Sequence, residues 1–369
     1  MPMHFRAEWI YFAIGFVIVC YSFASSVHMF MLPGSFAGNT IVRLSFRAMQ
    51  SVFRLVASFA RTQVGRDTVL GLYAPVCLLI AFAIGIAING AGFALMFYGI
   101  GQRSVKEALI DSGSALSTLG FTEFTDIAPT TLSVAEALMT TTMSALLIGY
   151  LPTVYSAYLS RESAMTALMT RLGPVKSSVE ILEEFAKDPG IDHLAPMWKD
   201  WAAWLTNVGQ SHSSLSGALF LRSPRGRISW LTTTAMLLDS AVLTKTTIDL
   251  PVEPEVSLCL DAGANSLWTI AESIRFRGNR DATWPETPIS ITRQDFDRAC
   301  AELESAGVPI KSDRDAAWKA FAEERVRFDA PLTLLHSLKH LPLPHLTGMA
   351  DAADIGGAKI PVVGWRSIH

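Results

Sequence analysis

Apolar stretches alternate with polar segments over the first 160 residues, and three of these stretches are long enough to cross a membrane. They are residues 9–32, 69–100 and 132–159. A helix needs about 20 apolar residues to cross the ~30 Å hydrocarbon core of a bilayer. The second stretch has 32 residues without a charge, so we expect its helix to tilt or to project beyond the bilayer. The pattern predicts three transmembrane helices.

The first apolar stretch has two interpretations. Arg6 precedes it and residues 22–24 (SFA) could be a small-residue cleavage site, so one interpretation is a secretory signal peptide. However, the stretch continues to Leu32, beyond the ~7–15 apolar residues of an ordinary signal peptide, and only Arg6 supplies a basic region before it. We therefore assign residues 1–33 to a retained N-terminal transmembrane helix.

A shorter pattern, residues 104–126, lies between the second and third stretches. Ser104 and Glu107 have the spacing of a capping box, which predicts a helix from Ser104 to about Ser117. A helix of roughly 13 residues is about 20 Å long, too short to span a bilayer. Residues 117–122 then form a small, hydroxyl-rich strip of poor helix formers. Non-helical backbone is tolerated at membrane depth only inside protein or beside water, so this pattern predicts a re-entrant pore helix and loop.

The strip carries a resemblance to a known family. The run TLGFTE at residues 118–123 resembles the Thr-Val-Gly-Tyr-Gly-Asp filter of potassium channels, and residues 114–121 are similar to the pore loops of the Trk/Ktr potassium-uptake family. The resemblance covers about residues 68–160. It implies a pore domain in which backbone carbonyls replace the hydration shell of a permeant ion, K⁺ first. The filter residues would be Thr118, Leu119, Gly120, Phe121 and Thr122.

The strip departs from the channel pattern at one position. Thr122 stands where a potassium channel has its second glycine, and a left-handed backbone there would cost a non-glycine residue ~1–2 kcal/mol. This departure leaves the ion selectivity open. An ordinary extracytoplasmic loop between two spans is the other interpretation of the strip, because short Gly/Ser/Thr runs are common.

Acidic residues near the strip are candidates for the pore mouth and cavity. Glu123 and Asp126 help to make the outer loop net acidic, which would concentrate cations. Glu136 is the only carboxylate within the three apolar stretches. An ionisable residue at membrane depth is a functional candidate, here either behind the filter or in the outer mouth. Asn89 is the polar residue of the second stretch, and we expect it to make a buried interhelical hydrogen bond.

The third stretch carries candidates for the cavity wall and for gating. Thr141 lies in a run of three threonines whose hydroxyls face a cavity or bind their own helix backbone. Gly149 and Pro152 predict a kink, because proline removes a backbone hydrogen bond and glycine relaxes steric restraint. The kink acts either as a gating hinge or as a passive bend.

An arginine-rich segment sets the topology. Residues 39–66 contain five arginines and no acidic residue. Four of them share one face at 100° per residue, which predicts an amphipathic helix within residues 34–67, either on the membrane surface or packed on a soluble domain. The positive-inside rule places this segment in the cytoplasm. The N-terminus and residues 104–126 are then outside, and the C-terminal part is inside. The four arginines are Arg43, Arg47, Arg54 and Arg61.

Charged residues gather in the C-terminal part. Residues 1–160 hold 8 Lys/Arg and 7 Asp/Glu, against 22 and 26 in residues 161–369. The net charge of −3 gives no electrostatic footprint for nucleic acid. Helical periodicity predicts a helical, cytoplasmic domain over 161–369 that could gate the pore. The expected helices cover residues 174–187, 195–210, 228–248, 256–276, 292–306 and 316–328.

Three features of this part have a structural and a functional interpretation. Its tryptophans are expected in the core rather than in a ligand cage. The arginines of RSPRGR at 222–227 lie in a solvated turn or bind an anionic group. His336 and His340 have ligand-compatible spacing, with His345 nearby, but no carboxylate or cysteine accompanies them, so we expect no bound metal apart from the permeant ion.

The sequence therefore predicts an all-α membrane protein with three transmembrane helices, a re-entrant pore helix and filter loop at 68–160, and a helical cytoplasmic domain. A filter built from one segment per chain needs four copies around an axis, so we expect a homotetramer in the cell (inner) membrane, surrounded by lipids. We expect no cofactor, no nucleic-acid partner and no enzymatic activity. The alternative is a non-conducting, membrane-anchored sensor or scaffold protein.

Overall fold

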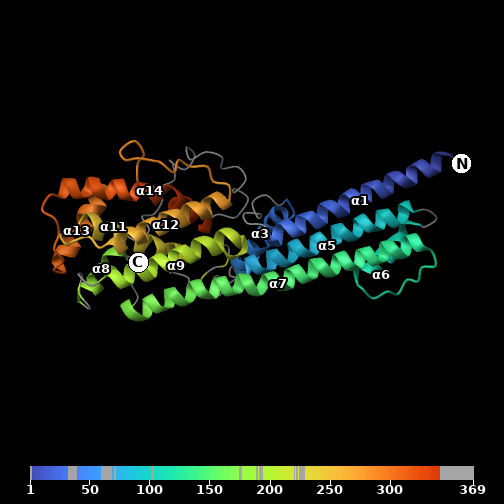
Figure 1. Cartoon of the computed structure of the whole chain (residues 1–369), viewed down its shortest axis with the longest axis horizontal. Coiled ribbons are helices and arrows are strands. Elements are labelled where there is room, and N and C mark those ends of the chain that lie inside the picture. The colour runs from blue at the N-terminus through green and yellow to red at the C-terminus, as the bar shows by residue number, and fades with distance from the viewer. Residues whose placement is uncertain are drawn as a thin grey trace. The chain divides into compact units, whose positions relative to one another are not determined.

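The computed structural model describes residues 2–31, 40–59, 69, 72–100, 104–173, 177–187, 190, 194–219, 221, 223 and 229–340. The regular elements in this part of the chain are α-helices, and one isolated β-bridge joins Ile248 to Ile310 (Figure 1). The predicted all-α class is thus confirmed for the described residues. The chain divides into two compact units: unit 1 is Met1–Leu55 with Leu72–Tyr155, and unit 2 is Val56–Gly71 with Ser156–His369.

Unit 1 contains the apolar helices. Three helical segments are long and apolar enough to cross a membrane. They are Glu8–Met31, Pro75–Gly99 and Ile127–Arg171, and the last of them extends into unit 2. The three predicted apolar spans are therefore present, as in a multi-pass membrane protein. The helices are α1 (Pro2–Met31), most of α3 (Thr40–Phe59), α5 (Tyr73–Gly99), α6 (Val105–Leu116) and the first part of α7 (Ile127–Leu172).

Small residues let α1 and α5 pack closely and antiparallel. A Cβ added at Gly92 would lie 2.8 Å from the Val19 side chain, and one at Gly99 would lie 2.6 Å from the backbone nitrogen of Phe12. The Ser22 hydroxyl donates to the carbonyl of Gly85 at 2.8 Å. Such close approach at small residues is typical of membrane helix pairs.

Helix α7 is longer than the sequence pattern predicts. The expected span was 132–159, whereas α7 runs over 46 residues with Pro152 inside it, about 69 Å at 1.5 Å per residue. The expected domain limit at residue 160 thus falls within a helix. The extra turns are stabilised because Met165 and Leu168 are buried in the core of unit 2, and this packing outweighs the one hydrogen bond that proline removes.

Unit 2 is a helical bundle around α11 (Trp230–Thr246), which is buried along nearly its whole length and packs against α8, α9, α12 and α14 (Figure 1). The prediction that tryptophans form this core is confirmed: Trp198, Trp201, Trp204, Trp230 and Trp268 are buried, and Trp318 packs against them. The other helices are α8 (Ser178–Lys187), α9 (Ala195–Ser214), α10 (Ser216–Leu219), α12 (Pro254–Ser273), α13 (Arg293–Ser305) and α14 (Arg314–His340).

The six helices predicted for unit 2 are present, with ends within four residues of expectation at all but one position. The exception is α14, which continues through Pro331 to His340 instead of ending at Phe328. The predicted helix in 34–67 is present as α3. Outside the described residues lie Arg61, Arg66, Arg222, Arg225, Arg227 and His345, together with the side chains of Arg43, Arg47, Arg54 and His340.

Candidate functional site

Helix α6 begins with the predicted capping box. The Ser104 hydroxyl accepts the N–H of Glu107 at 3.3 Å, and the Glu107 carboxylate accepts the N–H of Ser104 at 2.8 Å. The helix has 12 residues, about 18 Å at 1.5 Å per residue. It lies between α5 and α7 in the sequence and is shorter than either. The predicted helix is therefore confirmed, while its position in a bilayer stays a prediction.

The loop after α6 is bound back to that helix by Ser114. The N–H of Gly120 donates to the Ser114 carbonyl at 3.3 Å, and the N–H of Thr122 donates to the Ser114 hydroxyl at 3.0 Å. In a planar trans peptide the N–H and the preceding C=O point in opposite directions. The carbonyls of Leu119 and Phe121 therefore point away from Ser114, on the same side of the loop.

Two residues of this loop have left-handed backbone conformations. Thr118 has a φ of 57° and Gly120 has a φ of 64°. Glycine adopts such angles freely, whereas a threonine is strained by roughly 1–2 kcal/mol. Thr122 is not among the residues with positive φ, so the expected strain falls on Thr118 instead. The Thr118 hydroxyl donates to the carbonyl of Ser117 at 2.7 Å.

Large apolar side chains of the loop are uncovered in the single chain. Leu119 is 75% exposed and Phe121 is 61% exposed. By contrast, Phe124 stacks on Phe97 of α5 with ring centroids 5.7 Å apart. This contact holds the returning end of the loop against α5, while the apolar side chains before it lack cover from the described chain.

Most of the other predicted site residues are exposed as well. Glu123 and Asp126 are exposed in the loop, and Thr141, Gly149 and Pro152 are exposed on α7. The structure does not bring these five residues together within one chain.

Glu136 differs, because it is fully buried beside polar residues of other helices that no local sequence pattern links to it. The Ser112 hydroxyl lies 2.6 Å from Glu136 Oε1 and 2.9 Å from the carbonyl of Gly90, so it links α5, α6 and α7. Asn89 is fully buried, and neither its amide oxygen nor its amide nitrogen has a hydrogen-bond partner. The expected interhelical hydrogen bond of Asn89 is therefore not formed within the described residues.

Unit 2 contains a second buried polar cluster, centred on Arg161 of α7. Its guanidinium donates to His212 Nε2 at 2.9 Å and to the Leu221 carbonyl at 2.9 Å, and it pairs with Glu162 at 3.0 Å. Since arginine only donates, His212 accepts at Nε2 and is neutral. Burial, and then the positive charge of Arg161, lower the pKa of His212 to about 3. These contacts hold α7 against α9 and Leu221 within unit 2.

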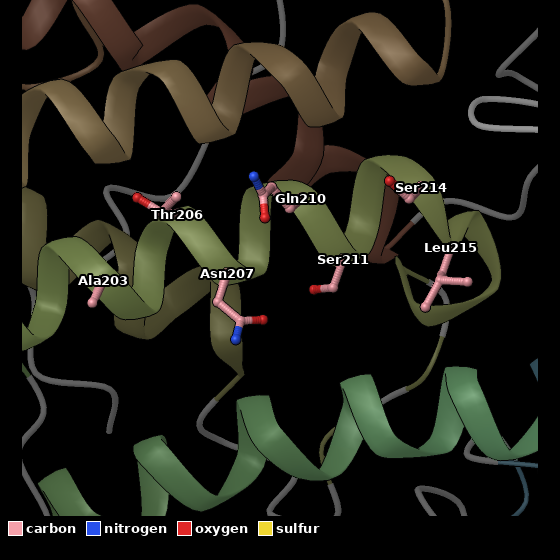
Figure 2. A pocket seen from close by; sticks show the side chains of 7 residues that line it. All are labelled: Ala203, Thr206, Asn207, Gln210, Ser211, Ser214 and Leu215. Atoms are coloured by element: carbon pink, nitrogen blue, oxygen red, sulfur yellow. The ribbon is translucent and has the colours of Figure 1, made fainter.

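A pocket lies along the exposed face of α9 in unit 2 (Figure 2). None of its lining side chains carries a charge or a nucleophilic thiol, so the pocket offers no acid–base or metal chemistry. Within the described residues, no group of three or more His, Cys, Asp or Glu side chains could hold a metal ion. The pocket is lined by Ala203, Thr206, Asn207, Gln210, Ser211, Ser214 and Leu215.

No protein-family model, no curated protein and no solved structure matches this chain. Its function therefore has to be inferred from its own residues. Among them, the loop from Thr118 to Thr122 contains two residues with positive φ, and Glu136 is a fully buried carboxylate within an apolar span. Both lie in or beside the short helix α6, which makes this part of unit 1 the candidate functional site.

Proposed function

We propose that the chain is one subunit of a homotetrameric cation channel of the cell (inner) membrane, with K⁺ as the expected permeant ion. The observation that carries the proposal is the orientation of the loop, in which the N–H groups of Gly120 and Thr122 bind Ser114 and the carbonyls of Leu119 and Phe121 point away from it. Carbonyl oxygens turned to one side can replace the hydration shell of a cation.

Exposed groups of the single chain support the tetramer. Leu119 and Phe121 place apolar surface in solvent, and such uncovered patches mark contact surfaces. Four copies around an axis would cover them and turn the exposed face of α7 with Thr141, Gly149 and Pro152 toward a central cavity. The C-terminal end of α6 carries the negative end of its helix dipole, which favours a cation near the loop.

The acidic loop residues and the C-terminal part complete the proposal. Glu123 and Asp126 would raise the local cation concentration at the outer mouth. Unit 2, on the cytoplasmic side, would gate the pore by moving α7, because the last turns of α7 belong to its core.

The test is cation flux through purified protein in liposomes, with K⁺, Na⁺ and Cl⁻ gradients compared. The Gly120→Asp variant should lose cation flux, because the side chain would block the axis and a left-handed aspartate would displace the carbonyls. Gly113→Asp is the matched control, since a Cβ at Gly113 would meet no atom within 4 Å and its backbone is helical. Thr122→Gly should conduct, because Thr122 needs no glycine for its φ.

The result that would refute the proposal is unchanged flux and ion preference in Gly120→Asp tetramers of verified size. A wild-type protein that passes no cation under any gradient would refute it as well. Either outcome would leave a non-conducting, membrane-anchored sensor or scaffold as the better hypothesis.

A further inference from the structure

Helix α3 carries an apolar stripe that is exposed along most of the helix. The first turns of α3 are packed into the molecule, because Ile41, Val42 and Ser45 are buried. Beyond them, large apolar side chains recur at helical spacing and are between 46% and 76% exposed. At 100° per residue they lie within about 120° of one another, so they form one continuous face. The members of the apolar stripe are Leu44, Val52, Leu55, Val56 and Phe59.

The middle of α3 lies at the end of an apolar span. The Phe53 ring contacts the Tyr73 ring edge-on, with 5.2 Å between the ring centroids. Tyr73 is the first residue of α5 and directly precedes the apolar segment Pro75–Gly99 (Figure 1). The boundary between hydrocarbon and headgroups falls near the start of such a segment, where tyrosine is a common residue. The contact therefore puts the middle of α3 at the level of the headgroups.

Charge favours a lipid surface over other occupants of the apolar stripe. Residues 39–66 contain five arginines and no acidic residue. The helical positions of Arg43, Arg47 and Arg54 share a face that is centred roughly 140° from the centre of the stripe. A cationic face beside an apolar face is typical of a helix that lies in the interface of an anionic bilayer. A second copy of this segment would instead add five arginines without an acidic residue to balance them.

We propose that α3 lies in the surface of an anionic bilayer, with the apolar stripe among the acyl chains and the arginine positions near the headgroup phosphates. The exposed stripe and its place at the end of a span favour the membrane surface among the two interpretations that the sequence leaves open for this segment. The proposal needs the apolar spans of unit 1 but not a pore. Through Phe53 and Tyr73, a change in anionic lipid would act on the start of α5.

The test measures the depth of α3 in a bilayer, with a spin label on the full chain. Cys20 is exposed and is first replaced by serine, while the three other cysteines are buried. A nitroxide is then attached at Val52→Cys, within the apolar stripe, or at Gln50→Cys, the matched control at roughly 160° around the helix. The protein is reconstituted in phosphatidylcholine alone or mixed with phosphatidylglycerol. The measurement compares collisions of the label with oxygen, which dissolves in acyl chains, and with a water-soluble nickel chelate.

The wild-type sequence at the other positions should place the label at position 52 in the acyl chains. In the mixed bilayer, the ratio of oxygen to nickel accessibility should be severalfold higher at position 52 than at position 50. In phosphatidylcholine alone the ratio at position 52 should fall, because the attraction between arginines and anionic headgroups is lost.

Two charge variants, each with the label at position 52, separate the arginines of α3 from net charge. In the first variant the ratio should be the same in both bilayers; it carries Arg43→Gln, Arg47→Gln and Arg54→Gln. The control variant removes the same charge from exposed positions of unit 2 and should keep the response to phosphatidylglycerol; it carries Arg275→Gln, Arg277→Gln and Arg280→Gln.

Four results would overturn the proposal. Nickel accessibility as high at position 52 as at position 50 would mean that the apolar stripe faces water. An equal ratio at position 52 in both bilayers, or a first variant that keeps the lipid response, would remove the role of anionic lipid. Low accessibility of position 52 to both reagents would mean that protein covers the stripe. Spin–spin broadening that disappears on dilution with unlabelled chain would identify that protein as a second copy.

Discussion

The buried ion pair between Asp239 and Arg325 allows a quantitative test of the core of unit 2. Asp239 lies on α11 and is fully buried, while Arg325 lies on α14 and is 3% exposed. The Arg325 guanidinium is 2.7 Å from Asp239 and 2.7 Å from Asp329. Arg325→Met keeps most of the side-chain volume but leaves both carboxylates without this shared cation, so we expect a large loss of stability.

The magnitude follows from the burial of the pair. Removing one partner of a buried ion pair costs ~3–5 kcal/mol, because the other partner stays desolvated. In a unit of 150–250 residues each kcal/mol lowers the unfolding midpoint by ~2–4 °C. Together these figures predict that Arg325→Met lowers the midpoint of unit 2 by roughly 6–20 °C.

Thermal unfolding of the full chain in detergent, followed by the fluorescence of the buried tryptophans, measures this midpoint. Arg293→Met is the control, because Arg293 is 38% exposed and its ion pairs lie at the surface. Exposed pairs contribute ~0–1 kcal/mol, so the control should shift by less than ~4 °C. If Arg325→Met unfolds within ~2 °C of the wild type, the reasoning on buried charge is wrong.

Three further predictions concern other contacts. The pKa of His212 is about 3 in the folded chain, below its ordinary 6.5, so the unfolded chain binds the proton at higher pH. The free energy of unfolding should therefore fall as the pH drops from 6.5 toward 3. A His212→Gln variant whose free energy of unfolding falls equally over this range would contradict the prediction. A fragment of residues 156–369 should show helical circular dichroism and unfold cooperatively. A fragment of residues 173–369 should be much less stable, because it lacks the buried residues of α7. Equal unfolding midpoints for the two fragments would count against the role of α7. Gly92→Leu should destabilise the α1–α5 pair by about 1–3 kcal/mol, which an unchanged unfolding midpoint would disprove.

Sequence reasoning succeeded where local signals decide the structure. The capping box at Ser104 and Glu107 placed α6, because it satisfies backbone groups that need no tertiary partner. Uncharged runs placed the apolar helices, and tryptophan-rich helical periodicity placed the core of unit 2. The pattern around Gly120 predicted a non-helical loop, and the structure has one there with a left-handed glycine.

It failed where distant residues decide. The apolar pattern predicted a third span that ends at residue 159, yet burial of Met165 and Leu168 in the core of unit 2 extends α7 to Leu172. The pairing of Arg161 with His212 spans 51 positions and has no local pattern. Asp239, a lone acid within an apolar helix, was a signal that a buried cation is needed, but the sequence could not say which residue supplies it.

The complete burial of α11 has a consequence for the order in which the protein can fold during synthesis. α8 and α9 leave the ribosome before α11, but α12 and α14, which cover its other faces, leave after it. A nascent chain that ends before α14 therefore carries an apolar helix with one side uncovered, and such surface is prone to aggregation and chaperone capture. Unit 2 can complete its core only when nearly the whole described chain has been translated, so premature truncation anywhere before α14 should yield a product that the cell degrades.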